Sequence, residues 1–265
     1  MLKKVKSKQI NPRFCPICNM PLLMNFAITD CFGKDTLWYL CKCGCFVNAE
    51  KQVNKSFYTS LYKDVYNSLK QVKERVAYFM DRYINLIEEM TYGRKFLDVG
   101  FTDTHYMDYM TDRGWIVDGI DLIENKYITG DFETHDFKNK RYDCIYMGQV
   151  LECFNDPVGM LKKAYGLLRQ EGVLLICTPC ADLAFHSGIK YFGHWNGSAN
   201  QIYFSTRTLL DTLHKIGYNV VVQYEHIGQR TLNWNVIHVI ARRESEEDKY
   251  VFETRDEDKQ DLQTV

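Results

Sequence analysis

The feature that most constrains the fold is an alternation of strand and helix patterns between Lys95 and Ala241. Short apolar runs predict buried strands, and the segments between several of them have the spacing of amphipathic helices. We expect strands at 96–100, 114–121, 127–131, 142–148 and 172–178, followed by an antiparallel pair at 218–225 and 234–241. This alternation is typical of an α/β domain with a largely parallel sheet.

The composition divides the chain into five segments. Residues 1–13 carry five bases and no acid and are expected to be a basic arm. Residues 14–50 are cysteine-rich and predict a small module, while 54–92 lack Pro and Gly and predict a linker helix. Residues 93–241 hold the α/β domain, and 242–265 form a charged tail with nine acids and five bases.

Overall charge and hydropathy exclude several classes of protein. Lys and Arg total 33 against 34 Asp and Glu, so the whole chain has no general attraction to nucleic acid or to an anionic membrane. The chain lacks an apolar run of about 18 residues, the length that a membrane-spanning helix requires. The first residues carry charge without an apolar stretch behind them, unlike a signal peptide. We therefore expect a soluble, cytoplasmic protein.

The cysteines are concentrated at the start of the chain, where six of the ten lie within the first 45 residues. In a cytosolic chain such clustering favours a metal site over disulfides. Cys15 and Cys18 form a CxxC pair, and a second group contains Cys41, Cys43 and Cys45. Two paired thiolates can supply the tetrahedral sulfur ligands of zinc, at about 2.3 Å from the ion.

The sequence allows more than one choice for the second pair of zinc ligands, because three cysteines lie close together there. We favour Cys41 and Cys43 over Cys45, because Gly44 directly after Cys43 suits a tight turn. A module of this size cannot bury enough apolar surface by itself, so metal binding would supply its folding energy. The predicted ligands Cys15, Cys18, Cys41 and Cys43 fill all four positions, so the zinc would be structural.

A dinucleotide- or nucleoside-binding pattern follows the first strand of the α/β domain. That strand ends at Gly100, a helix follows, and the next strand ends at Asp121. The glycine allows a ligand to approach the backbone, and the acid can accept hydrogen bonds from both ribose hydroxyls.

Together with this pattern, several further segments resemble class I S-adenosylmethionine-dependent methyltransferases, most closely the small-molecule and sugar methyltransferases that carry an N-terminal zinc ribbon. The matching segments are Phe96-Leu-Asp-Val-Gly100, Gly119-Ile-Asp121, Gly130-Asp131-Phe132, the run from Tyr142 to Pro157, the run from Leu167 to Pro179, and the segment from Trp195 to Gly217. The resemblance implies a seven-stranded Rossmann-like sheet whose last strand is antiparallel. It implies S-adenosylmethionine as cofactor and a small-molecule acceptor such as a nucleotide-linked sugar.

The candidate cofactor-binding residues follow from this resemblance and from their places in the chain: Asp98, Gly100, His105, Asp121, Asp131, Phe132 and Gly148. In the family, two more glycines follow the first, whereas Thr102 and Thr104 stand at those positions here. A β-branched residue at positive φ costs about 1–2 kcal/mol. The turn must therefore differ from the family's, or the cofactor must sit differently, or cofactor binding has been lost.

Methyl transfer from a sulfonium is an in-line displacement that requires alignment and, for some acceptors, a base. His194 is the candidate base, because an ordinary histidine titrates near pH 6.5. Glu152 and Tyr203 are candidates to orient the acceptor. In the alternative interpretation, His194 and Trp195 only pack a lid over the pocket.

A second functional class is a catalytically inactive methyltransferase-like scaffold. In that case, the cysteine-rich module, the basic arm and the inert domain would recognise a partner such as nucleic acid. The α/β domain lacks a basic stripe with interleaved aromatic residues, which weighs against nucleic acid.

Overall fold

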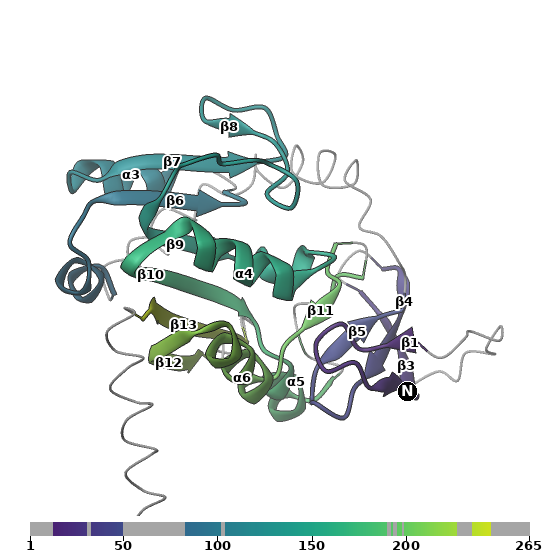
Figure 1. Ribbon diagram of the computed structural model, residues 1–265. Helices are drawn as coiled ribbons and strands as arrows, with labels where there is room; N and C mark the ends of the chain where they lie inside the picture. Colours follow the sequence, from purple (N-terminus) through teal and green to yellow (C-terminus); the bar gives the residue numbers. More distant parts are fainter. Residues whose placement is uncertain are drawn as a thin grey trace, which may run out of the picture.

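The computed structural model describes residues 13–30, 33–49, 83–101, 104–189, 192, 195–197, 199–226 and 235–244. These residues form a seven-stranded sheet with helices on both faces and a four-stranded sheet beside it (Figure 1). Most of the predicted basic arm, linker helix and charged tail lies outside the described residues, although residues 83–90 are helical as predicted. Among the described helices, none is long and apolar enough to cross a membrane.

The larger sheet has the strand order β12-β13-β10-β9-β6-β7-β8. β13 runs antiparallel to its neighbours β10 and β12, and the other pairs are parallel. The strands are β6 (Lys95–Val99), β7 (Ile116–Asp121), β8 (Ile128–Thr129), β9 (Tyr142–Gly148), β10 (Leu168–Pro179), β12 (Tyr218–His226) and β13 (Val236–Arg243). The predicted α/β class, the seven strands and the antiparallel last strand are confirmed.

Helices cover both faces of this sheet, which explains why β9 is buried over most of its length and β10 is buried from Gly172 to Pro179. On one face, residues 83–90 and α3 (His105–Asp112) share a buried cluster that includes Ile84, Met107 and Phe96. On the other face, α4 (Pro157–Leu167) and α6 (Thr206–Ile216) contribute Leu161 and Leu209 to a second cluster. The ribbon drawing shows α4 and α6 in front of the sheet (Figure 1).

Local capping chemistry sets the ends of α4 and α6. The Asp156 side chain caps α4 by accepting a 2.8 Å hydrogen bond from the Gly159 N–H, and Pro157 occupies the first turn. Ser205 caps α6 in the same way, and Gly217 closes that helix at φ 109°. Both helix starts therefore depend on side chains next to them in the sequence.

The described part of the segment 180–203 contains regular structure. α5 (Ala181–Ser187) begins directly after β10, and a short strand, β11 (Ile202–Tyr203), ends the segment. The helix forms because Ala181, Leu183 and Ala184 bury one face in the core.

The cysteine-rich module contributes the smaller sheet, whose strand order is β11-β5-β4-β3. The module supplies three strands of this sheet, β3 (Met24–Thr29), β4 (Asp35–Leu40) and β5 (Phe46–Asn48). Its two other strands, β1 (Arg13–Phe14) and β2 (Pro21–Leu22), pair with each other in a separate two-stranded sheet. The fourth strand of the sheet, β11, comes from the late part of the chain and pairs antiparallel with β5. Backbone hydrogen bonds therefore join the module of 14–50 to the domain of 93–241.

An aromatic core fills the space behind this shared sheet. Trp38 stacks on Tyr203 with ring centroids 4.7 Å apart and an interplanar angle of 22°. Trp195 contacts both rings, and Phe46 and Phe192 pack around them. Rings of this size bury a large apolar area, so the core fixes the module firmly against the α/β domain.

Candidate functional site

A cleft lies at the carboxyl ends of β6, β7 and β9, where parallel sheets of this type bind ligands. It encloses about 710 Å³ of open space, its mouth included. Its lining residues are Val99, Gly100, Ile120, Asp121, Leu122, Ile123, Gly130, Asp131, Phe132, Glu133, Gln149, Val150, Cys153, Phe154 and Asn155. Four of the predicted cofactor-binding residues, Gly100, Asp121, Asp131 and Phe132, therefore meet in one cleft.

Gly100 forms the turn at the end of β6, and its conformation and surroundings leave no room for a side chain. Its φ of 71° lies in the left-handed region, and a Cβ atom there would stand 2.6 Å from Val150 Cγ2. The Gly100 N–H donates a 2.8 Å hydrogen bond to the Ile120 carbonyl, which ties the turn to β7. Gly100 lines the cleft, and Val150, another lining residue, occupies the space that a side chain at Gly100 would need.

Thr104 adopts an ordinary backbone conformation, with φ −87° and ψ 5°. Its hydroxyl donates a 2.7 Å hydrogen bond to Asp108 Oδ2 in the first turn of α3. The strain expected for a β-branched residue at positive φ therefore does not arise at this position. Thr102 lies outside the described residues.

Asp121 ends β7 with its side chain half buried in the cleft. Its Oδ1 accepts a 2.8 Å hydrogen bond from the Ile123 N–H. Burial raises the pKa of this carboxyl to about 6, although the backbone N–H groups of Ile123 and Leu122 oppose the shift. The carboxylate thus has a position and acceptor capacity that suit the hydroxyls of a ribose.

The opposite wall is a tight turn that begins at Asp131. Asp131 Oδ1 accepts a 3.0 Å hydrogen bond from the Glu133 N–H, and the Asp131 carbonyl accepts one of 2.8 Å from the His135 N–H. Phe132 is buried between Phe137 and Phe154, with ring centroids 5.6 and 5.9 Å away. This wall offers an apolar ring and a carboxylate to a planar ligand group.

Three other predicted cofactor residues are absent from the described lining of the cleft. Asp98 is buried within β6, directly opposite Tyr146 of β9. Gly148 packs against Tyr146, whose hydroxyl would collide with any Cβ at that position. His105 begins α3.

Two of the predicted catalytic residues, Glu152 and Tyr203, are not among the described residues that line the cleft. Glu152 is 2% exposed, and its Oε2 accepts a 2.9 Å hydrogen bond from the Thr178 hydroxyl. Burial raises the pKa of Glu152 to about 7. The hydroxyl of the fully buried Tyr203 accepts hydrogen bonds from Asn200 Nδ2 and the Asn196 N–H. His194 lies outside the described residues.

Gln149 and Val150 are cleft residues that were not singled out from the sequence. Gln149 adopts φ 55° immediately after β9, and Val150 fills the space beside Gly100. Cys153 lies in a short 3-10 helix, η1 (Leu151–Cys153), and its Sγ lies 3.4 Å from Asn200 Oδ1. Their position directly after a buried strand was the available signal, since loops at strand ends form the sites of such sheets.

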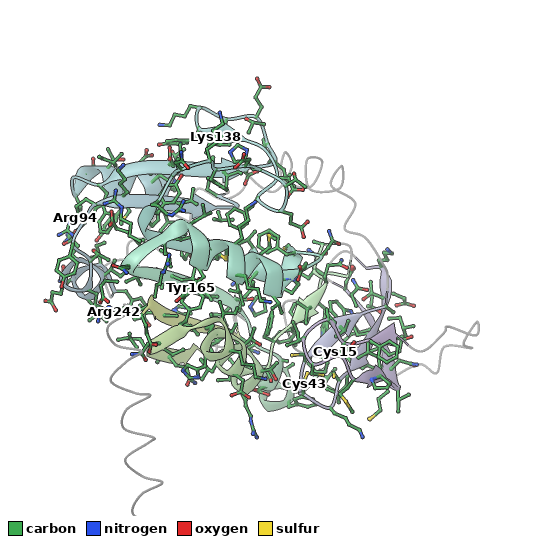
Figure 2. All side chains as sticks on the ribbon, in the orientation of Figure 1. Cys15, Cys43, Arg94, Lys138, Tyr165 and Arg242 are labelled. Carbon is green, nitrogen blue, oxygen red and sulfur yellow. The ribbon has the colours of Figure 1, made fainter. Side chains whose placement is uncertain are left out.

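A second site lies in the N-terminal module, where the sulfur atoms of Cys15, Cys18, Cys41 and Cys43 all lie within 4.8 Å of one another. Figure 2 shows the labelled Cys15 and Cys43 in this module, at the end of the molecule nearest β1. The Sγ–Sγ distances are 3.8 Å for Cys15–Cys43 and 3.3 Å for Cys18–Cys41. Tetrahedral zinc with bonds of about 2.3 Å places its sulfur ligands about 3.8 Å apart, so these residues fit a zinc ion.

Hydrogen bonds hold the cysteine cluster in place. The hydrogen bond between the Cys15 and Cys43 thiols raises the pKa of Cys15 and lowers the pKa of Cys43. Cys45 is fully buried near Cys43 but is not one of the four clustered sulfur atoms. The Cys43 carbonyl accepts hydrogen bonds from the Ser205 and Thr208 hydroxyls, at 2.9 and 2.6 Å. The turn that carries two thiols is therefore fixed to the start of α6.

Known proteins resemble this chain in sequence family and in fold. A family model described as a methyltransferase domain matches residues 71–223. A solved structure of 1,6-didemethyltoxoflavin-N1-methyltransferase from Burkholderia thailandensis, with bound 1,6-didemethyltoxoflavin and S-adenosylhomocysteine, has a TM-score of 0.57. It is 14% identical over 78% of this chain and 99% of that one. The N-methyltransferase NodS from Bradyrhizobium japonicum WM9 has a TM-score of 0.49 and 12% identity, over 66% of this chain and 99% of that one. No curated protein sequence is detectably similar.

The family match covers more than half of the chain, and the α/β part of the match contains the strands that build the cleft. The chain therefore belongs to the methyltransferase-domain family.

Proposed function

We propose that the protein transfers a methyl group from S-adenosylmethionine, bound in the cleft, to a small-molecule acceptor. Nucleotide-linked sugars are the acceptor class to test first. The observation that carries the proposal is the meeting of Gly100, Asp121 and Phe132 at the carboxyl edge of one parallel sheet. They supply an open backbone, a hydroxyl-binding carboxylate and an apolar ring, which together suit an adenosine.

The chain's own residues then have distinct roles. Bound S-adenosylmethionine supplies an already activated methyl group, so the protein mainly has to align the acceptor. Asp121 would accept hydrogen bonds from the ribose hydroxyls, and Asp131 and Phe132 would hold the adenine. Gly100 would allow the ligand to lie against the backbone at the end of β6.

The acceptor side of the site involves His194, Glu152 and Tyr203. His194 remains the candidate base. Glu152 and Tyr203 would act from behind the cleft wall, because both are buried and Asn200 bridges Tyr203 to the cleft residue Cys153. We therefore assign Glu152 and Tyr203 a positioning role.

Three observations support a small molecule over a macromolecule. The cleft is a concave site lined mainly by apolar groups with a few polar ones, which is the usual form of a small-ligand site. The chain carries almost equal numbers of acidic and basic residues, which gives no general attraction to nucleic acid. The structurally similar Burkholderia enzyme is described with a bound small molecule, 1,6-didemethyltoxoflavin.

We also propose that Cys15, Cys18, Cys41 and Cys43 hold a structural zinc ion. The sulfur spacing supports this, and protein ligands would fill all four positions and leave no site for substrate. The nine described cysteines are all reduced, which fits the cytoplasmic location that we expect.

Calorimetry and a methyltransfer assay together test the function. We expect S-adenosylhomocysteine to bind the purified protein and to raise its melting temperature, because a ligand that binds only the native state stabilises it. Release of S-adenosylhomocysteine from S-adenosylmethionine should then depend on a nucleotide-linked sugar and not on an RNA oligonucleotide. Saturating ligand with neither heat nor thermal shift would favour the inactive scaffold, and release driven by RNA would overturn the acceptor class.

A further inference from the structure

Lys163, in the middle of α4, points its ammonium group into the turn that forms the adenine-side wall of the cleft. Its Nζ donates hydrogen bonds of 2.7 Å to the carbonyl oxygens of both Phe132 and His135. The Glu133 carbonyl lies 3.4 Å from the same atom. One ammonium group therefore gathers three carbonyl oxygens of a single turn.

Aromatic rings surround the same ammonium group. Nζ lies 5.2 Å from the centroid of the Phe132 ring and 5.6 Å from that of Phe137. A cation near an aromatic face is attracted by the electron density of the ring. Lys163 thus fixes the backbone of the turn and also the ring of Phe132, a residue that lines the cleft.

Glu133 ties the same turn to the start of α4. Its carboxylate accepts hydrogen bonds from the Asn155 N–H at 3.0 Å, from Asn155 Nδ2 at 3.1 Å and from the Asp156 N–H at 3.3 Å. Asn155 also lines the cleft. The turn is consequently attached to α4 at two places, once through Glu133 and once through Lys163.

We propose that Lys163 is a positioning residue for the cofactor, which fixes the turn from Asp131 to His135 so that Asp131 and Phe132 present a preformed adenine-binding wall. This inference rests on the assignment of the cleft as the cofactor site. Lys163 does not line the cleft, and acts through the turn alone. A preformed wall binds more tightly because the ligand does not have to order it.

Substitution of Lys163, with a matched control on the same helix, tests this role. Lys163→Met keeps the aliphatic stem and removes the ammonium, and Lys163→Arg keeps a charged donor. Lys162→Met is the control, because Lys162 is exposed on α4 next to Lys163. The measurements are calorimetric titrations with S-adenosylhomocysteine and with 5′-methylthioadenosine, which retains the adenosine but lacks the amino-acid end.

We expect Lys163→Met to weaken the binding of both ligands about tenfold, a size typical of the loss of a charge-assisted hydrogen-bonding group. Lys162→Met should stay within about twofold of the wild type, and Lys163→Arg should recover most of the loss. Hydrogen exchange in peptides covering 131–137 should be faster in Lys163→Met than in Lys162→Met. A purely structural role would lower the melting temperature without this local change or the shared loss of affinity.

The outcomes separate this inference from the proposed function. If the wild type binds S-adenosylhomocysteine and Lys163→Met binds it equally well, the positioning role is wrong and the cofactor site stands. A loss of affinity for S-adenosylhomocysteine but not for 5′-methylthioadenosine would also overturn it, because the effect would then lie at the amino-acid end. Absence of binding by the wild type would overturn both.

Discussion

The side-chain amide of Asn48 donates a 2.8 Å hydrogen bond to the backbone carbonyl of Asn200, which lies far later in the chain. The same amide donates a 2.7 Å hydrogen bond to the Gly197 carbonyl, and the Asn48 N–H donates one of 2.9 Å to the Gln201 carbonyl. The Gln201 N–H in turn donates to the Glu152 carbonyl. Asn48 therefore connects the cysteine-rich module to the segment that supports the cleft wall, and we expect the two parts to unfold together.

Replacement of Asn48 should destabilise the whole chain. In Asn48→Ala, the two buried carbonyls lose their donor, which should lower the free energy of unfolding by about 2–3 kcal/mol. The control is Asn25→Ala, because Asn25 lies on β3 of the same sheet with an exposed side chain, and it should change stability by no more than about 0.5 kcal/mol. Urea unfolding followed by tryptophan fluorescence provides both values. Equal effects of the two changes would show that the Asn48 contacts contribute nothing.

Zinc content should distinguish Cys43 from Cys45. The sulfur atom of Cys43 belongs to the group of four, whereas that of Cys45 does not, although Cys45 is buried nearby. We expect Cys43→Ser to lose nearly all bound zinc and to melt at a lower temperature, because metal binding supplies folding energy to so small a module. Cys45→Ser should retain the metal. Metal analysis by mass spectrometry would assign the ligand to Cys45 instead if the two variants behaved in the opposite way.

Two glycine-to-alanine changes should act in opposite directions. Gly100→Ala adds a Cβ that would stand 2.6 Å from Val150, at a φ of 71°. It should cost more than about 1 kcal/mol of stability and weaken S-adenosylhomocysteine binding, since the methyl group projects at the cleft wall. In Gly166→Ala, within α4, the added Cβ meets no atom of the structure within 4 Å. This change should be neutral or stabilise the protein by about 0.5–1 kcal/mol. Thermal unfolding and calorimetry measure both variants, and a stable, ligand-binding Gly100→Ala would remove the argument for close backbone approach.

Local signals explain how much of the fold the sequence predicts. The strands are runs of apolar residues, and the starts of α4 and α6 depend on Asp156 and Ser205, each of which caps its own helix. Gly100 and Asp121 were identifiable for the same reason, because each ends a strand whose pattern is visible. Features that depend on a few neighbouring residues are therefore readable without the structure.

Tyr203 and Lys163 show why the rest could not be predicted. Tyr203 was selected for its chemistry, but β11 pairs with β5, and its ring is buried against Trp38. That pairing joins distant parts of the chain and leaves no periodic signal near Tyr203. Lys163 resembles any helix-surface lysine in the sequence, because its partners are backbone carbonyls, which every residue carries.

Burial raises the pKa of Asp121 to about 6, so cofactor binding and stability should both depend on pH near this value. An ionised carboxylate accepts hydrogen bonds from ribose hydroxyls more strongly, so affinity for S-adenosylhomocysteine should rise as pH increases through about 6. Stability should move in the opposite direction. The folded state holds the Asp121 proton more tightly than the unfolded state does. The stabilisation that this proton provides is therefore fully present below about pH 4 and is lost as pH rises through about 6.

Asp121→Asn should remove both trends, leaving binding weak and independent of pH. The pKa of Glu152 is raised to about 7, so the series is best measured in a Glu152→Gln background, which eliminates that titration. Calorimetry and urea unfolding between about pH 5 and pH 7 then compare the two chains, which differ only at residue 121. Because the ionised carboxylate binds ribose better but is the costlier form to bury, affinity and stability should change in opposite directions only where Asp121 is present. Affinity that rises equally in both chains would show that a group other than Asp121 controls cofactor binding.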